Sequence, residues 1–94
     1  MKQWQRKLVE DRNRTMTQQQ VQERRQWVLD CISASNCGMH THHILNLMAS
    51  SPLDRLYIRH DMDVLEHDGL LVSWSTYNRR LGRKWEAASK AASN

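Results

Sequence analysis

Several residue types are scarce in this sequence. Among 94 residues there is no phenylalanine, one proline, three glycines and two cysteines. Two cysteines, Cys31 and Cys37, are too few for a disulfide framework, so we expect small, mostly buried thiols. Hydrophobic residues make up 39% of the chain, which suffices for three helices and a hairpin but not for a second apolar layer. The composition therefore predicts one small domain without an elaborate enzyme cleft.

Long hydrophobic runs are also missing. No stretch of about eighteen apolar residues is present, as a membrane-spanning helix would require, and the first residues lack the apolar segment of a signal peptide. We therefore expect a cytoplasmic protein.

The motifs of common catalytic sites are absent from the sequence as well. There is no glycine-rich phosphate loop, no nucleophile elbow and no H-E-x-x-H motif. Residues of the types that bind zinc lie close together in the sequence, namely Cys31, Cys37, His40, His42 and His43. Their spacing, however, is not that of two paired zinc-binding motifs. We expect no enzyme, no catalytic residues, no cofactor and no metal, with solvated imidazoles at the start of a helix.

Basic residues outnumber acidic residues. The chain has 14 Lys and Arg against 10 Asp and Glu, a formal net charge of +4. A positive charge favours a polyanionic partner, because Lys and Arg neutralise phosphates and release condensed counterions. The alternative is that the charge only keeps the protein in solution.

The chain divides into an arm, a folded domain and a tail. We predict that residues 1–16 form a basic arm, which is flexible or partly helical, and that residues 88–94 form a flexible tail. The domain covers residues 17–87. Thr17 and Gln20 have capping-box spacing and predict a first helix over residues 18–35, which the Asn36-Cys37-Gly38 stretch ends. Its apolar face carries Val21, Val28 and Ile32, with Arg25 on the same stripe.

Two further helices follow. Thr41 is the expected cap of the second, whose apolar positions are Ile44, Leu47 and Met48. Asp54 is the expected cap of the third, near residues 55–67, with Leu53 and Ile58 as a hydrophobic staple. Ile58, Met62 and Leu65 form its buried face, and Gly69 closes it.

After Gly69 the apolar period changes to two. This alternation predicts a β-hairpin near residues 71–87, with the chain reversing between Asn78 and Gly82. Trp74 and Trp85 could face one another across its two strands.

The segment from His43 to Leu71 resembles the helix-turn-helix core of the winged-helix DNA-binding superfamily, in particular small bacterial or phage-type regulators. The resemblance is carried by Leu47-Met48, Leu53, Ile58, Met62, Leu65 and Asp68-Gly69-Leu70-Leu71. It implies a mainly α, α+β fold: a three-helix winged helix-turn-helix with a C-terminal two-stranded hairpin wing. Met48 stands where the family usually has a small residue, and Pro52 stands where the turn usually has glycine. Both departures affect the expected angle of the third helix.

The resemblance also implies sequence-specific binding of double-stranded DNA in transcription regulation. The third helix would enter the major groove and the wing would lie along the backbone. The implied base-reading positions are Arg55, Leu56, Tyr57, Arg59, His60 and Asp63. The implied backbone contacts are Arg79, Arg80, Arg83 and Lys84. A palindromic site would require a homodimer, for which Trp4, Leu8 or Trp27 could supply the contact.

The negative charge of the third helix leaves an alternative function open. Its acidic residues outnumber its two arginines; they are Asp54, Asp61, Asp63, Glu66 and Asp68. A carboxylate on the outward face repels phosphate unless it meets a cytosine amino group. The alternative is therefore a winged-helix module that binds another protein through this acidic face, in a complex of a phage or mobile element.

Overall fold

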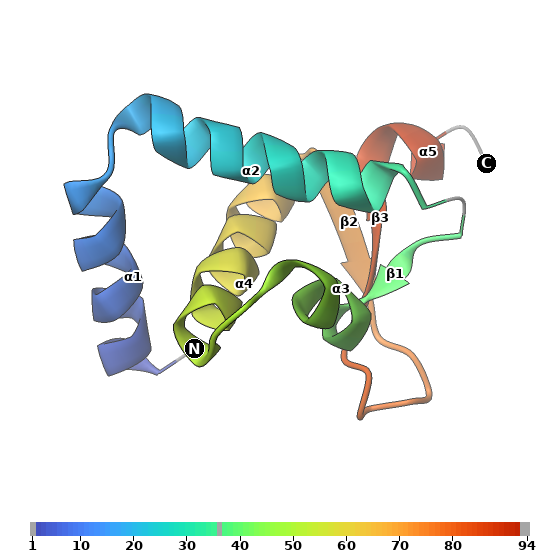
Figure 1. The fold of residues 1–94 in the computed structure, drawn as a ribbon. Coiled ribbons are helices and arrows are strands. Elements are labelled where there is room, and N and C mark those ends of the chain that lie inside the picture. Colours follow the sequence, from blue (N-terminus) through green and yellow to red (C-terminus); the bar gives the residue numbers. More distant parts are fainter. Residues whose placement is uncertain (1, 36, 93–94) are drawn as a thin grey trace.

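The computed structural model describes residues 2–35 and 37–92, and this part of the chain forms five helices and one three-stranded sheet (Figure 1). Met1, Asn36 and residues 93–94 lie outside the described residues, including the parts of the predicted arm, helix end and tail that fall there. None of the helices described is long and apolar enough to cross a membrane. The elements in chain order are α1 (Gln3–Thr15), α2 (Gln18–Ser33), β1 (Met39–His40), α3 (Thr41–Met48), α4 (Pro52–His67), β2 (Leu71–Trp74), β3 (Lys84–Ala87) and α5 (Ala88–Ala92).

The predicted first helix is confirmed as α2, which ends at Ser33. The capping box at its start is present as expected. Gln20 N donates to Thr17 Oγ1 over 3.1 Å, and Thr17 N donates to Gln20 Oε1 over 3.0 Å. These bonds satisfy amides that the first helical turn leaves without partners.

The expected caps of the next two helices are wrong. The residue that caps α3 is His40, and Thr41 is already helical. Ser51 caps α4, since its hydroxyl accepts a hydrogen bond from Asp54 N over 3.1 Å. Pro52 takes the first helical position, where a fixed φ and a missing N–H cost nothing. The helix therefore begins at Pro52, and Leu53 is 48% exposed instead of forming a staple.

The hairpin is confirmed, but it belongs to a three-stranded antiparallel sheet of order β1-β3-β2 in the described residues. Strand β1, which sequence reasoning missed, pairs Met39 with Trp85. Gly38 precedes it at φ +82°, and a Cβ there would lie 2.9 Å from the carbonyl oxygen of Trp85. Glycine thus permits the close approach of β1 to β3.

The expected Trp74–Trp85 pair is wrong. The register places Ser73 opposite Trp85 and Trp74 opposite Lys84. Because successive strand residues point to opposite faces, the two indoles lie on different faces of the sheet. Trp85 is buried in the core, whereas Trp74 is 38% exposed.

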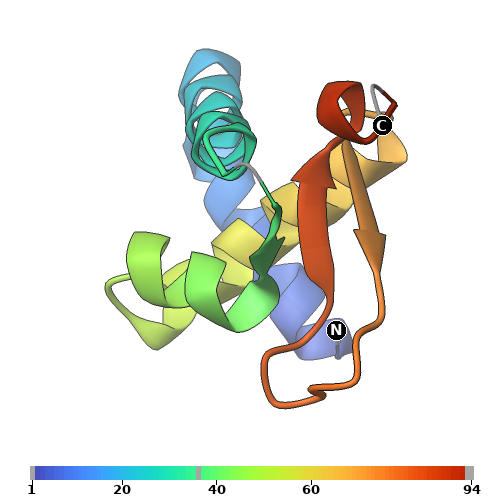
Figure 2. The ribbon, with the colours of Figure 1, turned by 90° about the vertical axis from the view of Figure 1, so that its right-hand side faces the viewer.

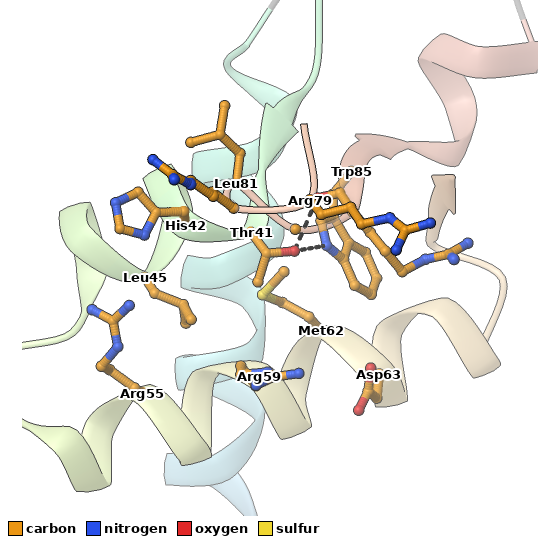
Figure 3. A pocket seen from close by; sticks show the side chains of 13 residues that line it. Thr41, His42, Leu45, Arg55, Arg59, Met62, Asp63, Arg79, Leu81 and Trp85 are labelled. Carbon is orange, nitrogen blue, oxygen red and sulfur yellow. Dashed lines mark hydrogen bonds between the residues drawn. The ribbon is translucent and has the colours of Figure 1, made fainter. Parts of the chain in front are cut away.

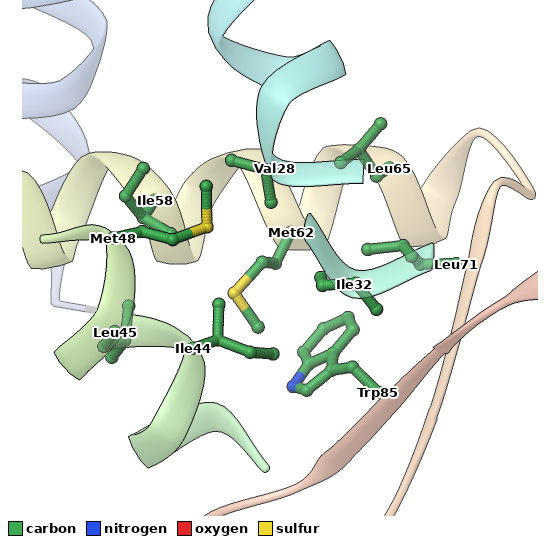
Figure 4. Packing of buried hydrophobic residues seen from close by; sticks show 10 residues of the cluster. All are labelled: Val28, Ile32, Ile44, Leu45, Met48, Ile58, Met62, Leu65, Leu71 and Trp85. Atoms are coloured by element: carbon green, nitrogen blue, oxygen red, sulfur yellow. The ribbon is translucent and has the colours of Figure 1, made fainter. Parts of the chain in front are cut away.

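The core fills the space between α2, α3, α4 and the sheet (Figure 4). The predicted apolar positions Val28, Ile32 and Ile44 are completely buried. Leu47 is an exception at 67% exposed, and Leu45 is buried in its place. The full cluster comprises Val28, Ile32, Ile44, Leu45, Met48, Ile58, Met62, Leu65, Leu71 and Trp85.

The segment expected as an arm is the helix α1, which packs against α4 and buries Val9 completely. At the other end, residues 88–92, expected as part of a flexible tail, form α5. Lys90 Nζ donates from α5 to the carbonyl oxygens of Ser33 and Ser35, at the end of α2. Both ends of the predicted domain are thus extended by helices that contact it.

A cluster around Asp61 connects α1, α2 and α4. The Asp61 carboxylate is completely buried. Arg24 donates to it from Nε over 2.5 Å and from Nη2 over 2.8 Å, and Arg25 donates from Nε over 3.2 Å. Arg24 Nη2 also donates to Asn13 Oδ1 on α1, over 2.9 Å. Arg25, which sequence reasoning placed on the apolar stripe, therefore points at a buried carboxylate on α4.

Candidate nucleic-acid interface

A groove of about 370 Å³ lies between α3, α4 and the hairpin loop, residues 75–83 (Figure 3). Figures 1 and 2 both show β2 and β3 running from α5 to this loop at the lower end of the molecule. Five arginines and one carboxylate line the groove together with apolar side chains. The charged residues are Arg55, Arg59, Asp63, Arg79, Arg80 and Arg83. The groove therefore has a strong excess of positive charge.

The predicted base-reading residues divide into two groups. Arg55, Arg59 and Asp63 follow one another at intervals of four residues, on one face of α4, and all three line the groove. Leu56, Tyr57 and His60 do not. Tyr57 is only 8% exposed, because it packs beneath the guanidinium groups of α1 and α2 at Arg12 and Arg24. Tyr57 is therefore buried away from the groove in which the prediction placed it.

His60 and Leu56 are half-buried on α4. Burial lowers the pKa of His60, and the neighbouring Arg25 and Arg24 act in the same direction, whereas Asp61 and Asp63 oppose the shift. His60 thus lies near the charged groups of the Asp61 cluster and outside the lining of the groove. This position favours a structural role for the imidazole.

We expect His60 to make the folded protein less stable in mild acid. The unfolded chain binds this proton more tightly, with an ordinary imidazole pKa of about 6.5. Stability is therefore present above about pH 6.5 and is lost as the pH falls toward the lowered pKa of the folded state. In urea unfolding titrations across this range, His60→Gln should flatten the fall in the free energy of unfolding. The exposed His67, changed to Gln, is the control, and an equal flattening there would contradict the assignment.

The predicted backbone contacts on the hairpin also divide. Arg79 and Arg80 are exposed, and their side chains have no hydrogen-bond or ion-pair partner within the described residues. Arg83 is held across the hairpin, donating to Ser73 Oγ over 2.9 Å and to Ser73 O over 3.0 Å. Lys84 lies on the sheet face opposite to Trp85, with its stem beside Gly38, and does not line the groove. On the hairpin, Arg79 and Arg80 are therefore the cations available to a ligand in the groove, while Arg83 links the two sides of the hairpin through Ser73.

The hairpin loop is anchored to the start of α3. Thr41 N and Thr41 Oγ1 both donate to the Arg83 carbonyl oxygen, over 2.8 and 2.9 Å, and His42 N donates to Leu81 O over 2.9 Å. Thr41 Oγ1 accepts from Trp85 Nε1 over 2.8 Å. Gly82 has φ +76°, and a Cβ there would approach Thr41 Cβ to 2.9 Å. The loop carbonyls thus satisfy the first amides of α3 and fix one wall of the groove.

The acidic residues of α4 are largely engaged within the fold. Asp54 accepts hydrogen bonds from the hydroxyl and the amide of Ser50, which lower its pKa. Asp61 belongs to the buried cluster, and Glu66 accepts from the hydroxyl of Ser73. Asp68 follows the last turn of the helix. Of these carboxylates, Asp63 lines the groove.

Two residues of α3 that sequence reasoning did not assign to the interface also contribute. His42 lines the groove, and Asn46 accepts a hydrogen bond from Arg55 Nη1 over 3.0 Å. Their four-residue spacing places them on one helix face. That spacing was visible in the sequence, but only the fold shows that this face is turned toward Arg55.

The cysteine and histidine residues do not assemble into a metal site in the part of the chain that the structure describes. No three His, Cys, Asp or Glu side chains lie together there as a metal would require. Cys37 is exposed, contrary to the expectation of a buried thiol, because it lies in the turn between α2 and β1. Cys31 is half-buried, and burial raises its thiol pKa.

No family model, curated protein or solved structure matches this chain. The inference of function therefore rests on the groove itself.

Proposed function

We propose that the protein binds double-stranded DNA sequence-specifically, as a winged-helix transcription regulator. The observation that carries the proposal is the convergence of α3, α4 and the hairpin loop on one groove lined by five arginines. A helix pair followed by a hairpin is the arrangement that the winged-helix resemblance implies. In this arrangement α4 lies in the major groove and the hairpin loop follows the backbone.

The charges in the groove support a duplex as the partner. Guanidinium groups bind phosphates and can bind guanine O6 and N7 through two parallel hydrogen bonds. The carboxylates that make α4 acidic in sequence are mostly held elsewhere in the fold, which reduces the repulsion that a phosphate would meet. Asp63 remains in the groove, where a cytosine amino group is its complementary partner.

The arginines of α4 and those of the hairpin loop have different roles in this proposal. Arg55 and Arg59 on α4 contact base edges, whereas Arg79 and Arg80 contact phosphates and provide affinity without sequence choice. Arg83 positions the hairpin through Ser73.

Changing both Arg79 and Arg80 to Ala tests the backbone role. The double variant should bind all duplexes more weakly by similar factors, and the slope of log K against log salt should fall by about 0.9 per lost contact. Fluorescence titrations of several unrelated duplexes over a range of salt concentrations measure both effects. Lys84→Ala removes a cation from outside the groove and is the matched control. Loss of binding to one duplex while the others are unaffected would mean that these arginines read sequence.

A further inference from the structure

Arg55 is held in the groove by a chain of side chains that crosses from α4 to α3. Arg55 Nη1 donates to Asn46 Oδ1 over 3.0 Å, and Asn46 Nδ2 lies 3.0 Å from His42 Nε2. Asn46 and His42 are one turn apart on α3. Both side chains are exposed and lie outside the hydrophobic core. In Figure 3 the Arg55 guanidinium points toward α3, on the side of His42.

The chemistry of the three groups fixes the direction of every bond in the chain. A guanidinium has only donors, so the amide oxygen of Asn46 must face Arg55. The amide nitrogen then faces His42, which must accept through Nε2 and therefore carries its proton on Nδ1 when neutral. An imidazolium has no acceptor at Nε2, so the complete chain requires neutral His42.

The hydrogen bonds from His42 to Arg55 leave one edge of the Arg55 guanidinium available to a ligand. Asn46 engages Nη1, while Arg55 Nε and Nη2 have no hydrogen-bond partner among the described residues. These two nitrogens form a planar fork that matches two acceptors side by side. Guanine presents such a pair, O6 and N7, in the major groove.

We propose that His42, Asn46 and Arg55 form a guanine-reading site, in which Asn46 is the positioning residue that aims the Nε–Nη2 edge of Arg55 at guanine O6 and N7. The site thereby names the class of duplex that the protein selects: one with a guanine opposite the start of α4. This inference rests on the proposed function.

The site is tested by selecting duplexes from a pool with a randomised central segment, and then replacing each guanine of the recovered duplex with 7-deazaguanine. This base pairs normally but lacks the N7 acceptor. At one guanine the replacement should weaken wild-type binding about tenfold. Inosine at the same place retains O6 and N7 and lacks only the minor-groove amino group, so it should have little effect.

Three variants then assign that guanine. Arg55→Ala removes every donor of the fork, so it should lose the 7-deazaguanine effect at this guanine. Asn46→Ala should reduce the effect about fivefold, the value of one hydrogen bond. Leu47→Ala, on an exposed neighbour outside the groove, is the control and should leave the effect unchanged.

Three results would overturn the inference. A 7-deazaguanine effect that persists in Arg55→Ala would assign the guanine to another residue, and an effect unchanged in Asn46→Ala would remove the positioning role. Either result leaves duplex binding itself intact. If the wild-type protein enriches no duplex from the pool even at low salt, the proposed function fails, and the guanine site fails with it.

Discussion

Asp61→Asn should lower the free energy of unfolding by about 3 to 5 kcal/mol, the cost of breaking a buried ion pair from one side. The side chain is completely buried and receives three hydrogen bonds from two arginines. Asparagine has nearly the same shape, so the loss would come from charge and not from a cavity. Arg24 and Arg25 would be left with 14% and 27% of their side chains exposed and no carboxylate to face. Urea unfolding followed by circular dichroism measures the change.

Asp63→Asn, two residues along the same helix, is the matched control for this experiment. Its side chain is exposed, so the change in the free energy of unfolding should stay within about 0.5 kcal/mol. The double variant Arg24→Met with Asp61→Leu should recover part of the lost stability, because apolar residues of similar volume can replace a buried ion pair. A loss below about 1 kcal/mol for Asp61→Asn would show that both arginines reach water without cost.

Arg59→Ala should reduce specific DNA binding by about 1 to 3 kcal/mol and relax the preference at one base pair. Arg59 is exposed on the groove face of α4, and its side chain has no partner within the described residues, so its removal should leave the fold intact. Titration against the selected duplex and a random duplex separates specific from nonspecific binding. Asp63→Asn should strengthen nonspecific binding, because it removes a negative charge from the groove that receives the polyanion.

The same variants distinguish DNA binding from a role in protein binding. Asp63 is the exposed carboxylate of the groove, and a protein that recognised an acidic surface would depend on it. In that case Asp63→Asn would weaken the protein complex, while Arg59→Ala would leave DNA retention unchanged. A DNA affinity insensitive to both Arg55 and Arg59 would contradict the proposed function.

The features that could be predicted from sequence depend on neighbours along the chain. The capping box of α2 joins residues three apart, and the buried face of α4 repeats at intervals of three and four. Both patterns arise from helix geometry, so they are visible before any tertiary contact is known. The arginines at positions 55 and 59 could be placed on one helix face in the same way.

The features that could not be predicted depend on contacts distant in sequence. Strand β1 has two residues and no periodicity of its own, and it is a strand because it pairs with β3. Asp61 resembled an ordinary surface carboxylate, because its partners lie 36 and 37 positions away. Arg83 resembled a free cation of the hairpin, although the register brings it to Ser73. Composition alone therefore overstated both the acidity of α4 and the number of cations available to a partner.

The hairpin loop has a root that is bonded to Thr41 and His42 through the carbonyls at positions 81 and 83, and a tip, residues 77–80, whose hydrogen bonds stay within the loop. The tip begins at Tyr77, which is fully exposed, and carries Arg79 and Arg80. Residues inserted at positions 77–80 would lengthen the reach of this finger without moving α3 or the reading face of α4. The tip of the hairpin loop could thus change in length or sequence while α3 and α4 keep their positions, and other loop tips could be grafted onto this domain.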